Sequence, residues 1–366
     1  MNRWSPRAAW AARLNSVAWA SAKALALLNA LGPEGLPAAD AGRWSTASGL
    51  TLARAEVWRR QALAFDADGE FRKAEALGAR LLVRGEPDYP PLLSDIEDAP
   101  LVLYAVGPLE DAPTVAVVGT RAPTAYGRRM ARALAGDLAR RRVVVVSGLA
   151  RGIDAEAHEA ALNAGGATWA VLGSGLGQVY PPDNRDLARR IVDEGGCLLS
   201  EFPIGFTPQQ YSFPRRNRVV AGLSWATVVV EGGGKSGALQ TAQCAGQYGR
   251  DVFGVPGPAD SPLSEAPHRL LRSGARLAAS ARDVLELLPP GLPRGPLTPN
   301  RAGPPPAVEG EEGRILQVMG GDSLSLEELG KITGLDMGRL SLIMFGLEIK
   351  ELVSAVPGQR YAKKTL

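Results

Sequence analysis

Short hydrophobic runs alternate with longer amphipathic stretches through the middle of the chain. The runs are rich in valine and bounded by glycine or polar residues, which is typical of buried strands. Between them, apolar residues recur at helical spacing. This alternation predicts an α/β fold with a doubly wound parallel sheet. The expected strands are 101–106, 114–118, 143–147, 168–172, 197–200, 227–231 and 251–255, and the expected helices are 126–142, 154–164 and 186–194.

Residues 1–78 are rich in alanine and leucine at helical spacing, and we assign them to a small helical domain. Glycines and prolines between Leu31 and Leu36 break the pattern. The break resembles the connection in sterile-alpha or helix-hairpin-helix domains. We favour a helical cap that serves only packing, because no polar residues are concentrated there.

Proline and glycine dominate residues 288–308, which predicts an extended, semi-rigid linker. The central domain would therefore span 79–287. Residues 309–366 read as a compact unit in which Ser325 is the N-cap of a helix. Three helices and a hairpin there predict a winged helix: helices near 313–319, 326–332 and 337–347, and strands near 352–356 and 359–362.

Composition limits the kind of partner. The 366 residues are 45% hydrophobic, which is enough for two or three domains. There are 41 basic and 38 acidic residues, so any surface that attracts nucleic acid must be a local patch. Polar residues interrupt every apolar stretch near the N-terminus, so we expect no signal peptide and no membrane span. Cys197 and Cys244 are too few for a disulfide framework, and we expect both to be buried in a reducing cytoplasm.

Each predicted strand of the central domain ends in a loop of small or polar residues. Parallel strands bring such loops to one edge of the sheet, where they would form a continuous anion-binding floor. The loop from Gly232 to Gly237 adds an ammonium and a hydroxyl group to its backbone amides. The other loops are Gly119-Thr120-Arg121, Ser147-Gly148 with the residues up to Asp154, and the glycine-rich 173–177.

The run Phe213-Pro-Arg215-Arg216-Asn217-Arg218 combines an aromatic ring with three arginines. Such a combination suits a phosphodiester chain with unstacked bases. Phe213 could instead belong to the core, but its polar neighbours, residues 209–212, favour a surface ring on which a base stacks.

Familiar nucleotide motifs fail, so no cofactor is expected. A P-loop would need glycine where Val229 stands, and a dinucleotide fingerprint would need glycine at Gln178.

Arg121 suits a phosphate better than its alternative, a salt bridge to a helix carboxylate. Asp154 and His158 could form an acid–base pair, but we favour a helix N-cap with a hydrogen-bonded histidine.

The ordered series of motifs resembles one family, DNA-processing protein A (DprA, Smf) of bacterial natural transformation. The matching stretches include VAVVGTR, VVVVSGLARGIDAEAHEAAL, LLSEFPIG and FPRRNRVVAGLSWATVVVEGGGKSGALQTA. The resemblance implies an extended Rossmann-type domain with a winged helix appended. It also implies a cytoplasmic homodimer that binds single-stranded DNA without catalysis. Such a protein displaces single-strand-binding protein and loads the RecA recombinase onto incoming strands.

Carried over by motif, the resemblance implies a set of nucleic-acid-binding residues. The chain departs from the family pattern at residues 264–271, a segment that contributes to dimerisation in relatives, and at Gln240. The implied residues are Gly119, Thr120, Arg121, Ser147, Gly148, Phe213, Arg215, Arg216, Asn217, Arg218, Lys235, Ser236 and Gly237.

Two rival functions remain. A phosphoribohydrolase of the cytokinin-activating (LOG) type shares the sheet and a glycine loop, but it needs a helix glutamate where this chain offers Gln240 or Gln243. A scaffold whose winged helix binds duplex DNA is the other. Its recognition helix, residues 337–347, would carry only Arg339 as a base-reading cation.

Overall fold

The computed structural model describes residues 4–17, 21–288, 310–319, 323–349, 352–356 and 360–363. The chain divides into two compact units. One contains the N-terminal helices and the sheet, and the other contains the C-terminal residues. The predicted linker, 288–308, lies outside the described residues except for Leu288.

The N-terminal region is helical, as predicted. The helical pattern was expected to be interrupted near residues 31–36. The interruption is a kink within one helix, at Gly32, whose φ of 64° and ψ of 170° are not helical. The side chains of Asp40, Thr51 and Asp66 accept hydrogen bonds from backbone N–H groups and cap three of the helices. The helices are α1 (Pro6–Val17), α2 (Ser21–Ala38), α3 (Ala41–Ser48), α4 (Leu52–Ala64) and α5 (Ala67–Ala76).

The sheet has nine strands in the order β1-β2-β6-β5-β4-β3-β7-β8-β9. Strands β3 to β9 run parallel, and β2 pairs antiparallel with both β6 and β1. Every predicted strand is confirmed, whereas β1 and β9 were not predicted. The strands are β1 (Arg80–Val83), β2 (Val102–Val106), β3 (Thr114–Val118), β4 (Val144–Ser147), β5 (Thr168–Val171), β6 (Cys197–Ser200), β7 (Ala226–Val229), β8 (Asp251–Gly254) and β9 (Arg276–Leu277).

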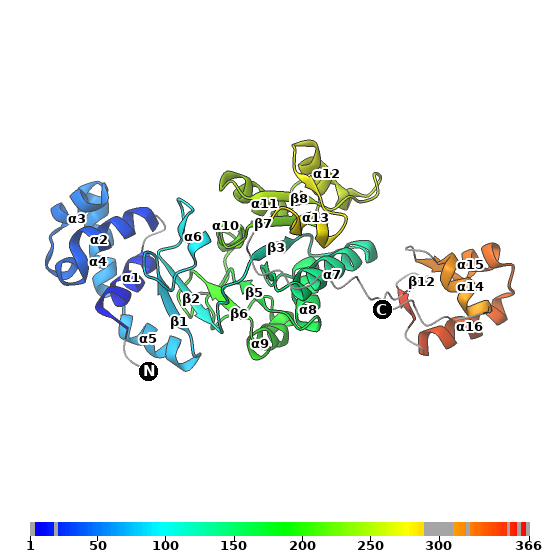
Figure 1. The fold of residues 1–366 in the computed structure, drawn as a ribbon. Helices are drawn as coiled ribbons and strands as arrows, with labels where there is room; N and C mark the ends of the chain where they lie inside the picture. Colours follow the sequence, from blue (N-terminus) through cyan, green and yellow to red (C-terminus); the bar gives the residue numbers. More distant parts are fainter. Residues whose placement is uncertain are drawn as a thin grey trace. The chain divides into compact units, whose positions relative to one another are not determined.

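Helices cover both faces of the sheet because successive strand residues point to opposite sides. In β5, Ala170 belongs to the apolar core that α8, α9 and the N-terminal helices share, while Trp169 and Val171 belong to the core that α10 and α11 share. Figure 1 shows the N-terminal helices, in blue, next to β1 and β2. The helices are α6 (Pro91–Ser94), α7 (Ala125–Arg140), α8 (Ile153–Asn163), α9 (Arg185–Asp193), α10 (Ser212–Gly222), α11 (Gly237–Gln247), α12 (Glu265–Arg272) and α13 (Ala281–Leu285).

The connections reverse direction at β3. From β3 the chain moves through β4 and β5 to β6 on one side, and then returns to β7 and β8 on the other. In open α/β sheets, ligands bind beyond the carboxyl ends of the strands at such a reversal. The fold therefore predicts a ligand site at the loops that follow β3 and β7.

The C-terminal unit is a winged helix, as predicted. Its capping box joins Ser325 and Glu328. A small apolar core that includes Ile315, Leu340 and Met344 holds the helices together. The elements are α14 (Glu311–Val318), β10 (Leu324–Ser325), α15 (Leu326–Thr333), α16 (Met337–Ile349), β11 (Val353–Val356) and β12 (Arg360–Lys363).

The expectation that both cysteines are buried is confirmed for one of them only. Cys197 in β6 is buried, but Cys244 on α11 is only partly buried, because one side of that helix turn faces outward. Among the described residues, none of the helices is long and apolar enough to cross a membrane.

Candidate nucleic-acid interface

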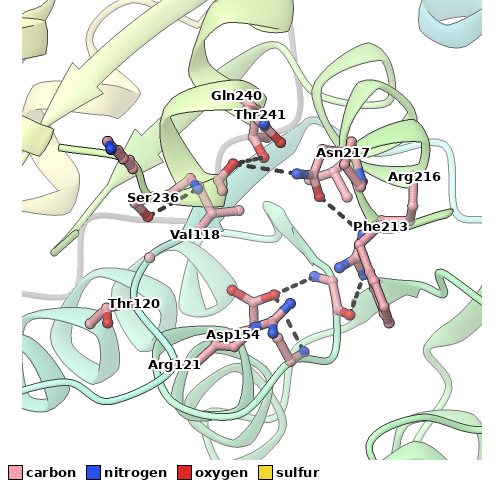
Figure 2. Close-up of a pocket in the computed structure, with 18 of the residues that line it drawn as sticks. Val118, Thr120, Arg121, Asp154, Phe213, Arg216, Asn217, Ser236, Gln240 and Thr241 are labelled. Atoms are coloured by element: carbon pink, nitrogen blue, oxygen red, sulfur yellow. Dashed lines mark hydrogen bonds between the residues drawn. The ribbon is translucent and has the colours of Figure 1, made fainter. Parts of the chain in front are cut away.

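A pocket of about 820 Å³ lies at the carboxyl ends of β3 and β7. Its walls are the loops after β3, β4 and β7 and the first turns of α10 and α11 (Figure 2). Helix N-termini carry partial positive charge and unsatisfied N–H groups, so this arrangement favours an anion. Ten of the thirteen residues predicted to bind nucleic acid line the pocket: Gly119, Thr120, Arg121, Gly148, Phe213, Arg216, Asn217, Lys235, Ser236 and Gly237.

The other three predicted residues lie outside the lining. The hydroxyl of Ser147 is fully buried and donates to the Val117 carbonyl at 2.7 Å. Arg215 and Arg218 both pair with the buried carboxylate of Glu201, with Arg215 Nε 2.9 Å from its Oε2. These two guanidinium groups neutralise a buried charge and are not directed into the pocket.

The loop at 173–177 does not join the floor, contrary to expectation. The Gly175 and Gly177 amides donate to the Phe206 and Ile204 carbonyls, each at 2.9 Å. A Cβ on Gly175 would overlap the backbone of Pro203 and Ile204. The returning segment 203–206 therefore occupies the amides that were expected to bind an anion.

Arg121 is exposed, and its guanidinium carbon lies 5.6 Å from the centre of the Phe213 ring. This geometry is a cation–π contact, which orients the arginine at the pocket mouth without neutralising it. Within the described part of the chain, the contact found for Arg121 is this ring and not a helix carboxylate. Figure 2 shows Arg121 and Phe213 approaching from the β3 loop and from α10.

Arg216 forms the buried floor of the pocket. Its guanidinium donates to the carbonyls of Gly148 and of Val171, the latter at 2.5 Å. Burial lowers the pKa of Arg216 to about 10, while the nearby Asp154 carboxylate opposes that shift. The group is therefore still protonated at neutral pH, and it fixes the Gly148 loop from below.

Asp154 holds the same loop from the other side. Its Oδ2 accepts hydrogen bonds from the Gly148 and Ala150 amides at 3.0 and 3.4 Å. Burial raises the pKa of Asp154, and Arg216 counteracts part of that effect. The prediction of an N-cap is wrong in detail, because Gly152 occupies the N-cap and Asp154 is the second residue of α8.

His158 is fully buried, and its Nδ1 lies 2.7 Å from the Thr168 hydroxyl. Burial lowers the pKa of His158 to about 3, so the ring is neutral at physiological pH. It does not line the pocket. The pairing with Thr168 is the hydrogen-bonded state that we favoured over acid–base chemistry.

In the glycine–lysine loop, residues 232–237, several backbone amides already donate hydrogen bonds to other groups of the protein. The Gly232 amide donates to the Leu263 carbonyl at 2.7 Å, and the Gly234 amide donates to the Glu265 carboxylate at 2.9 Å. The loop thus offers fewer free amides than its sequence suggested. Ser236 caps α11, and Lys235 is exposed at the pocket wall.

Sequence reasoning missed several lining residues, among them Tyr180, Gln210 and Thr241. Tyr180 lies within a Tyr-Pro-Pro-Asp-Asn turn that follows β5, and the position of that turn was the available signal. Thr241 lies four residues after Gly237, one turn into α11, where helical spacing brings it to the same wall.

The family of the chain follows from its sequence matches. The model of the family described as DNA recombination-mediator protein A matches residues 80–289, and that of the DprA winged helix domain matches residues 299–359. The chain belongs to the DprA/Smf family. Protein Smf of Synechocystis is 37% identical over 320 residues, which are 78% of this chain and 80% of that protein.

Solved structures of the family share the fold. The X-ray structure of DNA processing protein A from Streptococcus pneumoniae is 34% identical, with a TM-score of 0.67 over 78% of this chain and 99% of that one. DNA processing protein A from Helicobacter pylori, described for its single-stranded DNA binding mode, is 31% identical. Its TM-score is 0.52 over 57% of this chain and 94% of that one.

Proposed function

We propose that this DprA/Smf-family protein binds single-stranded DNA, protects incoming transforming strands and loads the RecA recombinase onto them. Family membership supports the proposal, as does the description of the Helicobacter pylori relative by its single-stranded DNA binding mode. The observation that carries it is the pocket that exposed Arg121 and Lys235 line together with the Phe213 ring.

The chemistry of that pocket suits a nucleic-acid backbone with unstacked bases. Arg121 and Lys235 supply charge for two phosphates, and the Thr120 and Ser236 hydroxyls supply further hydrogen bonds. A Cβ on Gly119 would lie 2.6 Å from Ile153 Cγ1, so glycine there lets the loop after β3 pack closely against the start of α8. We assign Arg216 a structural role, the support of the pocket floor. Arg215 and Arg218 also have a structural role, because each forms an ion pair with Glu201.

Binding without reaction is the proposed outcome. Asp154 is the carboxylate among the described lining residues, and its Oδ2 already accepts two amide hydrogen bonds. Gln240, which lines the wall near the position of a helix glutamate in LOG-type enzymes, cannot act as a carboxylate base. We therefore expect no release of adenine from AMP, and measurable release would replace this proposal with the enzymatic one.

Fluorescence anisotropy with labelled oligothymidylate tests the proposed site. Arg121→Ala and Lys235→Ala should each weaken binding about tenfold, which corresponds to the loss of one charge-assisted contact. The matched control is Arg189→Ala, an arginine on α9 whose side chain is 71% exposed and which does not line the pocket. Wild-type affinity in both pocket variants, with unchanged circular dichroism, would remove the proposal.

The finer parts of the proposal concern partners. On circular single strands coated with single-strand-binding protein, the protein should shorten the lag of RecA's DNA-dependent ATPase. Arg121→Ala should lose that effect. Sedimentation should give a homodimer. If the Arg121→Ala variant stimulated RecA as fully as the wild type, RecA loading would not depend on DNA binding in this pocket.

A further inference from the structure

Tyr180 stands at the rim of the pocket, beside the aromatic ring that the sequence identified. Its ring centre lies 5.6 Å from that of Phe213, with the planes tilted by 47°. The residue is 43% exposed, whereas Tyr89 and Tyr104 are 3% and 0% exposed in the core. Tyr180 therefore presents a large apolar surface to solvent at a site where unstacked bases would lie.

The turn that carries Tyr180 is anchored to the loop after β4. The Asn184 side-chain amide donates to the carbonyls of Leu149 and Ala150, at 2.9 and 3.2 Å. On the surface, Arg151 pairs with Asp183 at 2.6 Å. Two prolines follow Tyr180 directly and restrict the backbone. A ring held in this way is preorganised, because little conformational entropy remains to be lost when a ligand binds it.

Phe213 has less free surface than its position suggested. The Arg121 guanidinium lies over its ring, and the ring packs against the backbone of Gly173, where a Cβ would lie 2.7 Å from Phe213 Cδ1. Tyr180 contacts the ring from a further side. The more accessible aromatic surface at this wall thus belongs to Tyr180.

We propose that Tyr180 forms a second base-stacking subsite, next to the phosphate subsite at Arg121. A base stacks on the outward side of the Tyr180 ring while Phe213 supports the ring from within. Arg151, whose side chain is 59% exposed, forms a surface ion pair with Asp183. Such pairs exchange readily, so the Arg151 guanidinium is available for the phosphate attached to that nucleotide. The inference rests on the proposed function and extends it by one nucleotide.

Stacking and backbone contacts can be separated with two oligonucleotides that share a phosphodiester backbone. One is oligothymidylate, and the other carries abasic tetrahydrofuran units in place of the bases. Tyr180→Ala should weaken oligothymidylate binding at least about fivefold and leave abasic binding unchanged, since stacking requires a base. Tyr180→Phe keeps the ring and should bind both as wild type does.

Tyr211→Ala is the matched control, because Tyr211 is 53% exposed and does not line the pocket. It should not change either affinity. An equal loss on both oligonucleotides in Tyr180→Ala, or no loss on either, would overturn the subsite while leaving the proposed function intact. If the wild-type protein binds neither oligonucleotide, the proposed function and the subsite both fail.

Discussion

At the scale of single residues, the arginines of the run 213–218 have different roles. Helical phase separates them, because residues three and four apart share a face. Phe213, Arg216 and Asn217 face the pocket, whereas Arg215 and Arg218 face Glu201. The sequence shows the composition of this run, but the roles follow only when α10 is known to begin at Ser212.

Arg216 and Asp154 are opposite charges buried beneath the pocket, and each stabilises the charged form of the other. Removing one of them should therefore be costly. Arg216→Met would leave the Asp154 carboxylate buried without its counter-charge, so we expect a loss of about 3–5 kcal/mol in the free energy of unfolding. Adding Asp154→Asn should recover part of this loss, which thermal unfolding would measure. Equal unfolding temperatures for Arg216→Met and wild type would show that the pair does not support the floor.

At the scale of elements, the strands of the central sheet were predictable because runs of β-branched residues buried on both faces have few other interpretations. The strand β9 has only two residues, too few for a pattern. The loop at 173–177 was misassigned for a physical reason. Its glycines permit the close approach of segment 203–206, and a glycine that admits protein backbone looks the same in sequence as one that admits phosphate.

The N-terminal helices hold that returning segment in place. Buried Glu70 on α5 accepts the Ile204 amide at 2.6 Å, and Asn15 on α1 donates to the Glu201 carbonyl at 2.8 Å. The helical region thus shares contacts as well as a core with the sheet, which supports the packing role favoured for it.

Removing the Glu70 acceptor should destabilise the protein. In Glu70→Ala the buried Ile204 amide would lose its partner, at a cost of about 1–3 kcal/mol. Glu70→Gln keeps an acceptor oxygen and should lose less. Thermal unfolding followed by circular dichroism measures both variants. An unfolding temperature in Glu70→Ala equal to that of wild type would contradict the assigned contact.

At the scale of the whole molecule, the reversal of strand order at β3 creates the site. The loops after β3, β4 and β7 come from distant parts of the sequence and meet because the sheet is parallel there. Sequence alone predicted this meeting from the rule for parallel strands. It could not predict which amides remain free, because those depend on segments such as 203–206 and on Glu265.

The salt dependence of single-strand binding tests the central claim, that this pocket holds a phosphodiester backbone. For single strands, log K falls with log salt by about 0.7 for each neutralised phosphate. We predict that the slope becomes shallower by about 0.7 in Arg121→Gln and again in Lys235→Gln, and by about 1.4 in the double variant, while Arg189→Gln keeps the wild-type slope. A wild-type slope in the double variant would contradict the account.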